Sequence, residues 1–182
     1  MALIDKIDSL SITKEIEGVA AVIKDFSGRI LMVVENENKS WKKKGQLSIP
    51  METVEEWESL DDALKRWLKE ELWFDLDKEE WLYKLVFSER NVPFLVKTDK
   101  DLILVRLYMY NLCIDDDLSN RLSKFKNWEI KEVKQIPFGD IFSWKLRNLR
   151  PGVKEALFGF SGHVPVIKDG EYVDFLKSDY NF

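Results

Sequence analysis

One stretch of sequence decides the fold: PMETVEEWESLDDALKRWLKEELWF, which runs from Pro50 to Phe74. Its first half is a loop rich in carboxylates. Ser59 is a good N-cap, and Asp62 three residues later gives an aspartate version of the capping box. Apolar residues then recur at helical spacing: Leu60, Ala63, Leu64, Trp67, Leu68 and Leu72. We therefore predict a helix that starts at Ser59 and packs one face on a core.

Two adjacent glutamates, Glu70 and Glu71, fall in the last turn of this helix. At about 100° per residue, Glu71 lies in the middle of the apolar face and Glu70 lies on its edge. An unpaired buried carboxylate would cost several kcal/mol or be forced to take up a proton. Glu71 therefore needs a cation, a metal ion or an opening to water. The alternative is that the pair belongs to an ordinary solvated face.

Composition limits the kinds of protein that this chain can be. Its 182 residues are 45% hydrophobic, which is enough to bury a sizeable core in one domain with a tail. The formal net charge is −5, so general DNA or RNA binding is not expected. No apolar run approaches the roughly 20 residues of a membrane span, and the N-terminus lacks the pattern of a signal peptide. We expect a cytoplasmic protein without membrane partners.

Two residue types are almost absent. Cys113 is the one cysteine, so it can form neither an internal disulfide nor a Cys-based zinc site. His163 is the one histidine, which makes a His triad or a multi-His metal centre hard to assemble. Carboxylate chemistry is what remains for this chain.

Apolar and β-branched runs predict the strands. GVAAVIKD, from Gly18, and RILMVVEN flank Phe26–Gly28 and form the pattern of a hairpin. LILVRLYMYNLCI, at Leu102–Ile114, is the strongest run, and we expect it at the centre of a sheet. Further strands are expected at Leu10–Ile16 as an edge strand, Gln46–Ile49, Leu82–Phe87 and Glu129–Ile136.

Other segments have weaker patterns. Ser88–Lys100 is interpreted as a long excursion, suited to a lid, and Ser119–Asn127 as a polar segment. Gly139–Leu146 is expected to form a short helix, and VKEALF another, with Pro151 at its first position. HVPVIKDGEYVDF alternates around Asp169 and a glycine like a second hairpin.

This order of elements indicates an α+β sandwich. The expected division is a lead-in at residues 1–17, a domain at 18–158 and a hairpin-like extension at 159–182. The extension could cover an edge strand, close a pocket or form an interface, and the sequence does not choose among these.

The stretch around the helix resembles the Nudix box, G-x5-E-x7-R-E-U-x-E-E-x-G-U, in which U is aliphatic. The resemblance covers roughly residues 18–158. The matching positions are Glu58, Arg66, Leu68, Glu70, Glu71 and Phe74. Three positions depart from the box: Glu52 stands at the first glycine, Trp67 at the glutamate after the arginine, and Trp73 at the late glycine.

The resemblance implies a Nudix-like α/β/α sandwich with a mixed β-sheet and a loop–helix–loop that carries Mg²⁺ or Mn²⁺. It implies hydrolysis of a diphosphate linkage in a nucleoside diphosphate derivative, a small-molecule ligand, and is compatible with a homodimer. Metal ligands would be Glu70 and Glu71, with Glu58 or Glu52 replacing the carboxylate lost at Trp67. Glu70 and Arg66 would act in catalysis, Arg66 by orienting the carboxylates.

Each of these roles has an alternative. The chain could be a Nudix-like module that has lost turnover and binds a nucleotide or a protein, with Trp67 filling the metal site. Arg66 could simply pair with a neighbouring carboxylate on the helix surface. The basic loop Trp41–Lys44 could meet phosphates and a base or could be solvated. Trp67 and Trp73 are most simply core residues.

Overall fold

The computed structural model of the chain describes residues 11–36, 45–79, 83–141, 149–158, 163–169 and 171–177. Within these residues nine strands form one mixed sheet, with the order β3-β2-β1-β6-β5-β8-β9. β4 pairs with β1 and β7 pairs with β2. The strands are β1 (Lys14–Asp25), β2 (Arg29–Glu35), β3 (Leu47–Ser48), β4 (Met51–Thr53), β5 (Tyr83–Lys97), β6 (Leu102–Ile114), β7 (Ile130–Pro137), β8 (His163–Lys168) and β9 (Glu171–Lys177).

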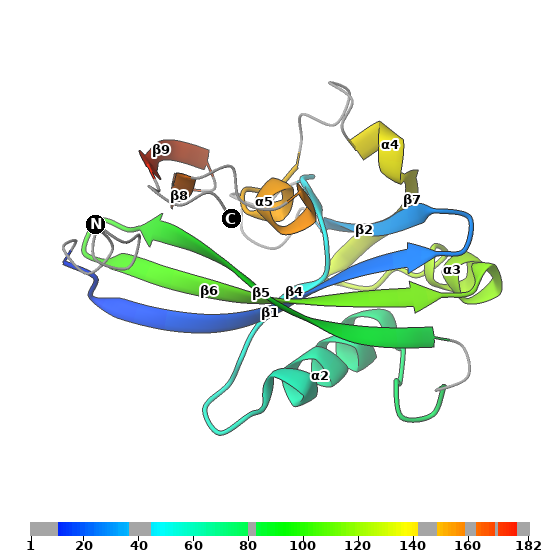
Figure 1. Cartoon of the computed structure of the whole chain (residues 1–182). Helices are drawn as coiled ribbons and strands as arrows, with labels where there is room; N and C mark the ends of the chain where they lie inside the picture. The colour runs from blue at the N-terminus through cyan, green and yellow to red at the C-terminus, as the bar shows by residue number, and fades with distance from the viewer. Residues whose placement is uncertain are drawn as a thin grey trace.

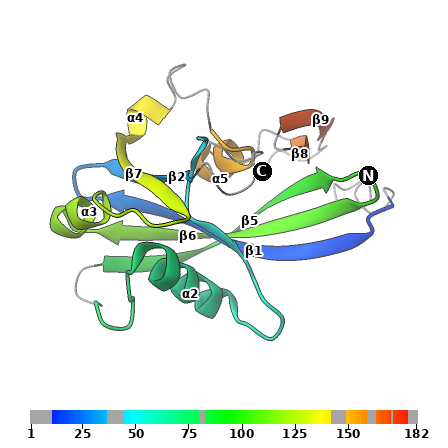
Figure 2. The same ribbon diagram turned by 180° about the vertical axis from the view of Figure 1, so that it is seen from behind.

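Helices cover both faces of the sheet, as Figures 1 and 2 show from opposite sides. α2 (Leu60–Leu72) packs on one face, and its buried residues share a core with β1, β2 and β6. α5 (Val153–Phe158) packs on the other face over a second apolar cluster. α3 (Asp116–Leu122) and α4 (Phe138–Ile141) are short. The predicted α+β sandwich is therefore confirmed.

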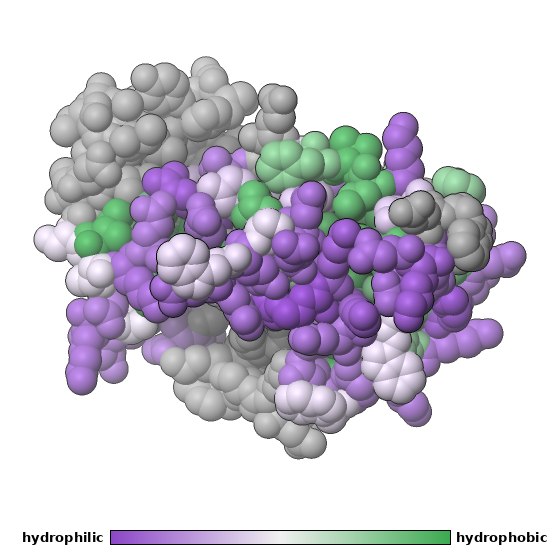
Figure 3. Space-filling view, turned by 90° about the horizontal axis from the view of Figure 1, so that it is seen from below, coloured by the Kyte–Doolittle hydropathy of each residue, from purple (hydrophilic) through white to green (hydrophobic). Residues whose placement is uncertain are grey.

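The helix predicted at Ser59 is confirmed in detail. The Ser59 hydroxyl accepts a hydrogen bond from the Asp62 N–H at 3.1 Å, and donates to the Asp62 carboxylate at 2.6 Å. Five residues of the predicted apolar face are buried: Ala63, Leu64, Trp67, Leu68 and Leu72. The opposite face is charged, and Figure 3, which views the molecule from the α2 side, shows a mainly hydrophilic surface. Tyr110 of β6 is buried, and its hydroxyl donates a hydrogen bond to the Asp61 carboxylate. This bond connects the start of α2 to the sheet.

Most predicted strands are confirmed. β1 and β2 form the first hairpin, and β6 has the predicted bounds and lies between β1 and β5. The edge strand expected at 10–16 is confirmed for residues 14–16: they begin β1 and, among the described residues, pair on one side only, with β6, because β4 and β2 pair with later positions of β1. No helix within the described residues is long and apolar enough to cross a membrane.

Two segments differ from expectation. Ser88–Lys100 is not an excursion, because β5 continues to Lys97 through a register irregularity between Phe87 and Asn91. A β-bulge absorbs the polar residues there without ending the strand. Ser119 belongs to helix α3, whose N-cap Asp115 accepts from the Leu118 N–H at 2.6 Å.

The late elements are shifted in part. α4 covers 138–141, and residues 142–146 of the predicted helix lie outside the described residues. α5 begins at Val153, so the prediction that Pro151 is its first residue is wrong by two positions. The predicted C-terminal hairpin is confirmed as β8 and β9, and β8 pairs in parallel with β5. The hairpin therefore covers the free edge of β5.

Candidate functional site

A cavity of about 530 Å³ is lined by residues of the sheet and of the segments that flank it. Its walls come from β1, β4, β5 and β6, from the segment before α5, and from the end of β8. Trp67 and Glu71 of α2 also line it. The cavity therefore joins the Nudix-like box to residues far along the chain.

Arg66 holds the loop that precedes α2. Its Nε and Nη2 donate to the two oxygens of Glu58, each at 2.9 Å, and Nη2 also donates to the Thr53 carbonyl at 3.1 Å. The hydrogen bond from Arg66 is the main reason that the pKa of Glu58 lies below its usual value. Both oxygens of Glu58 are thus used within the protein.

The other three predicted ligands are placed differently. Glu52 and Glu71 both line the cavity. Glu52 accepts from the Thr53 N–H at 2.8 Å, and the Asn127 side chain donates to the Glu71 carbonyl at 3.3 Å. Glu70 is absent from the residues that line the cavity, and its side chain is 65% exposed, 4.0 Å from Arg66. The structure therefore brings Glu52 and Glu71 to one cavity and leaves Glu58 and Glu70 outside it.

Four further carboxylates that sequence reasoning did not select line the cavity: Glu17, Asp99, Glu129 and Asp169. Glu17 is on β1, and Glu129 directly precedes β7. Tyr108 donates to Glu17 at 3.0 Å, and burial, followed by this carboxylate, raises the pKa of Tyr108. The sequence placed Glu129 at the start of the predicted strand at 129–136. That it reaches the cavity depends on the tertiary fold, which no local pattern shows.

Trp67 replaces a carboxylate with an apolar wall. Its side chain is only 5% exposed and belongs to the core beneath α2, while part of it lines the cavity. The prediction that Trp67 is a core residue is confirmed. Trp73 is different: it is 75% exposed, so the prediction that it is a core residue is wrong.

Trp73 ends α2 in the left-handed conformation, at φ 52°, where glycine is most at ease. Its indole contacts the ring of Phe125, with centroids 5.4 Å apart. Glu52, by contrast, is not among the described residues with positive φ. The replacement of the first glycine of the box therefore costs no strain of this kind, whereas the replacement of the late glycine does.

Cations line another part of the cavity. They are Lys97 at the end of β5, Arg150 before α5, and Lys168 at the end of β8. The Lys168 ammonium lies 3.0 Å from the Asp99 carboxylate. Sequence reasoning placed basic residues at Lys42–Lys44, which lie outside the described residues, and did not select these three.

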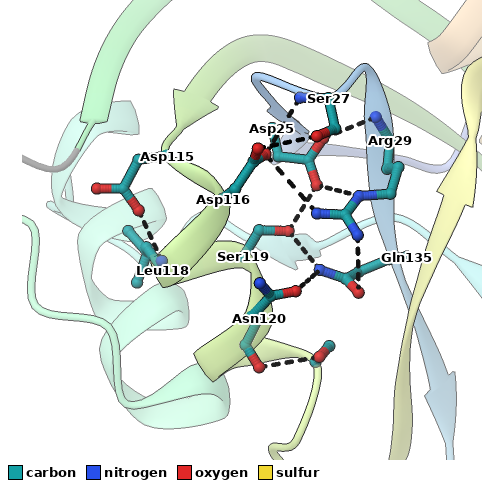
Figure 4. Close-up of polar contacts among 10 residues, drawn as sticks. Asp25, Ser27, Arg29, Asp115, Asp116, Leu118, Ser119, Asn120 and Gln135 are labelled. Carbon is teal, nitrogen blue, oxygen red and sulfur yellow. Dashed lines mark hydrogen bonds and ion pairs between the residues drawn. The ribbon is translucent and has the colours of Figure 1, made fainter.

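A separate polar cluster joins the β1–β2 turn to α3 and β7 (Figure 4). The buried Asp25 carboxylate accepts from the Arg29 N–H at 2.8 Å, from Arg29 Nε at 2.7 Å and from the Ser119 hydroxyl at 2.8 Å. The Gln135 amide donates to Ser119 at 2.8 Å and to Asn120 at 3.0 Å. Because the Asp25 oxygens are satisfied within the protein, this cluster serves the packing of α3 rather than a ligand.

The carboxylates of the cavity suit a divalent ion only when a phosphorylated ligand supplies further ligands to it. Among the described residues, no three acidic, His or Cys side chains are grouped so that they could hold a metal ion. Mg²⁺ usually binds one or two carboxylates together with waters and substrate phosphates. Glu52 and Glu71 therefore suit an ion that is bound jointly with a phosphorylated ligand, and do not suit one held by the protein alone.

Comparisons with known proteins agree on one family. A family model described as the NUDIX domain matches residues 14–158. A MutT protein from Methanosarcina mazei is 18% identical, with a TM-score of 0.53 and coverage of 81% of this chain and 94% of that one. The E. coli dihydroneopterin triphosphate pyrophosphohydrolase is 16% identical, with a TM-score of 0.53 and coverage of 79% and 96%. A NUDIX hydrolase from Nitrosomonas europaea also has 16% identity and a TM-score of 0.53, with coverage of 79% and 86%. No curated protein matches the chain.

Proposed function

Because the chain belongs to the NUDIX domain family, we propose that it hydrolyses a diphosphate linkage in a nucleoside diphosphate derivative bound in the cavity. The observation that carries the proposal is that Glu52 and Glu71 line the same cavity. Sequence identities of 16–18% to the structures above support the fold and leave the substrate to be tested.

The proposal includes a divalent ion, Mg²⁺ or Mn²⁺, shared between Glu52, Glu71 and the phosphates of the ligand. Such an ion would polarise a phosphoryl oxygen and make a water more nucleophilic. Because both oxygens of Glu58 accept from Arg66, we assign these two residues the positioning of the loop before α2.

Glu70 enters the proposal as the general base. Its carboxylate is 65% exposed to water and directly precedes Glu71 in the last turn of α2. The role comes from the match of Glu70 to the box: Glu70 does not line the cavity, and a base must come within reach of the proton that it removes when the ligand is bound. Glu70→Gln therefore tests this role separately: turnover should fall while the affinity for the ligand stays unchanged.

The metal is tested by calorimetric titration of Mn²⁺ into the protein, with and without a non-hydrolysable nucleoside diphosphate analogue. We expect heat of binding only when the analogue is present, and its loss in Glu71→Gln. Glu56→Gln is the matched control, because Glu56 is exposed and does not line the cavity. Mn²⁺ binding that is the same with and without the analogue, or the same in Glu71→Gln, would contradict the proposal.

A second candidate function is a binding module without turnover. Trp67, 5% exposed at a position where the box has a glutamate, favours it. In that case the analogue should bind with equal affinity in Mn²⁺ and in EDTA, and no product should form from nucleoside diphosphate derivatives. The same titrations therefore separate the two candidates.

A further inference from the structure

The C-terminal hairpin builds one wall of the cavity although it lies beyond the family domain. The NUDIX match ends at residue 158, and the hairpin starts at His163. Ile167, Lys168 and Asp169, at the end of β8 and in the turn that follows, all line the cavity. Part of the cavity wall therefore comes from residues beyond those that the family model matches.

The hairpin is fixed in place by the sheet and by one tyrosine. β8 pairs with β5 at Val166 and Ile167. The Tyr172 hydroxyl of β9 donates to Glu155 at 2.8 Å and accepts from the Gly152 N–H at 3.0 Å. Burial raises the pKa of Tyr172, so its hydroxyl keeps its proton at neutral pH. The wall that contains Lys168 is thus held in place by contacts within the fold.

Three cations from three elements line this cavity. Lys97 ends β5, Arg150 precedes α5, and Lys168 ends β8. Lys168 is paired with Asp99, a side chain that is 90% exposed and so only weakly attached. Among the described residues none forms an ion pair with Lys97. Asp99 and Asp169 also line the cavity, so the five groups together carry a net formal charge of +1, which favours an anionic group there.

Lys97 lies far from Glu52 of the box along the sheet. Glu52 is level with Tyr108 of β6, because both are in register with Val19 of β1. Lys97 is level with Leu102 of the same strand. The six residue steps from Leu102 to Tyr108 span roughly 20 Å at a rise of about 3.3 Å per step. A ligand that uses both ends must therefore be extended and carry two anionic groups.

We propose that the cationic wall of Lys97, Arg150 and Lys168 binds a phosphate monoester on the part of the ligand remote from the scissile diphosphate. The inference rests on the proposed function, which places the diphosphate beside Glu52 and Glu71. A phosphate monoester carries close to two negative charges and three acceptor oxygens, which suits three cations from separate elements. The substrate class is then a nucleoside diphosphate derivative that bears a second, terminal phosphate.

Two pairs of probes test this, since the members of each pair differ by one phosphate monoester: NADP⁺ against NAD⁺, and coenzyme A against dephospho-coenzyme A. We expect the phosphorylated member of at least one pair to bind about tenfold tighter, as for loss of a charged hydrogen-bonded contact. Lys168→Gln and Lys97→Gln should each bring this ratio toward one. Lys100→Gln is the control, because Lys100 is exposed in the same β5–β6 turn but does not line the cavity.

Tyr172→Phe tests whether the hairpin positions the wall. It removes the hydroxyl that joins Glu155 and Gly152 and leaves the three cations in the chain, so the affinity ratio should fall while thermal unfolding shows a folded protein. Added salt should also reduce the ratio in the wild type, because it screens exposed charges. This second measurement needs no variant.

The outcomes are distinct. Equal affinity within both pairs, or a ratio that Lys168→Gln and Lys97→Gln leave unchanged, overturns the inference and leaves the proposed function intact. Failure of all four probes to bind, with Mn²⁺ or without it, overturns the proposed function and the inference together.

Discussion

Arg66 and Glu58 are joined by two parallel hydrogen bonds, from Nε to Oε1 and from Nη2 to Oε2, both of 2.9 Å. This planar pairing joins the middle of α2 to the loop before it, and the bond to the Thr53 carbonyl adds β4. Only a guanidinium can make all three contacts at once. The pair therefore sets where α2 begins relative to the cavity.

Arg66→Lys keeps the charge and loses the paired geometry. We expect it to lower the free energy of unfolding by about 1 to 2 kcal/mol, measured by urea denaturation. Lys65→Gln is the control: Lys65 pairs with Asp77 through side chains that are 42% and 69% exposed, so its loss should cost less stability than Arg66→Lys. Equal losses in the two variants would contradict the role given to Arg66.

The Asp25 cluster predicts a dependence of stability on pH. Hydrogen bonds from Arg29 and Ser119 lower the pKa of Asp25 although burial opposes this. The carboxylate therefore stabilises the fold above its unfolded pKa of about 3.9, and this contribution disappears as pH falls through the lower folded value. Asp25→Asn should lower the free energy of unfolding at pH 7 by about 2 to 3 kcal/mol and flatten the pH dependence below about pH 4.

The control for Asp25 is Asp116→Asn, because Asp116 belongs to the same cluster but its side chain is 45% exposed. Its loss should cost less than that of Asp25 at pH 7. Urea unfolding at pH 7 and at pH 3 measures both variants. A pH dependence that survives in Asp25→Asn would assign the acid sensitivity to other carboxylates.

Trp73 carries the backbone strain of the altered box. Trp73→Gly and Trp73→Ala both remove the contact with Phe125, and they differ in how easily the residue adopts φ 52°. We expect the glycine variant to be about 1 kcal/mol more stable than the alanine variant, by urea denaturation. The same order is expected at Trp57, whose φ is 69° and which is 96% exposed. Equal stability of the two variants at both positions would show that these conformations carry no strain.

Trp67→Glu restores the carboxylate that the box has and this chain lacks. In EDTA it should lower the thermal midpoint strongly, because a charge enters a site that is 5% exposed. Mn²⁺ should raise the midpoint of this variant more than that of the wild type, since the new carboxylate joins Glu71 on the same cavity. Trp67→Gln is the control, and an equal response of the two variants to Mn²⁺ would contradict a shared site.

The sequence predicted what local patterns encode. The N-cap at Ser59, the apolar face of α2 and the long strand β6 each follow from neighbouring residues, and each is confirmed. Helix α3 was missed although Asp115 is an N-cap and Leu118 and Leu122 are spaced for a buried face. Its seven residues are too few for periodicity alone to reveal.

The candidate site was predicted only where the box supplied it. Glu52 and Glu71 line the cavity. Glu58 and Glu70 do not, because Glu58 is bound by Arg66 and Glu70 lies on the solvent-exposed side of α2. Lys97 and Lys168 lie on neighbouring strands because β5 and β8 pair in parallel, with paired positions 71 residues apart in the chain. No local pattern reports a pairing over that distance.

The pairing of β1 with β6 also has a consequence for how the protein is made. Twelve positions of β1 pair in parallel with β6, and each partner lies 89 residues later in the chain. At a synthesis rate of about 5–20 residues per second, β1 leaves the ribosome roughly 5–20 s before β6. The β5–β6 hairpin and the β1–β2 hairpin can each close early, since their strands are adjacent in the chain, while the pairing of β1 with β6 must wait until β6 has been made. We therefore expect the docking of β1 onto β6 to limit the rate of folding. Until it docks, the apolar residues of β1 are exposed to chaperones.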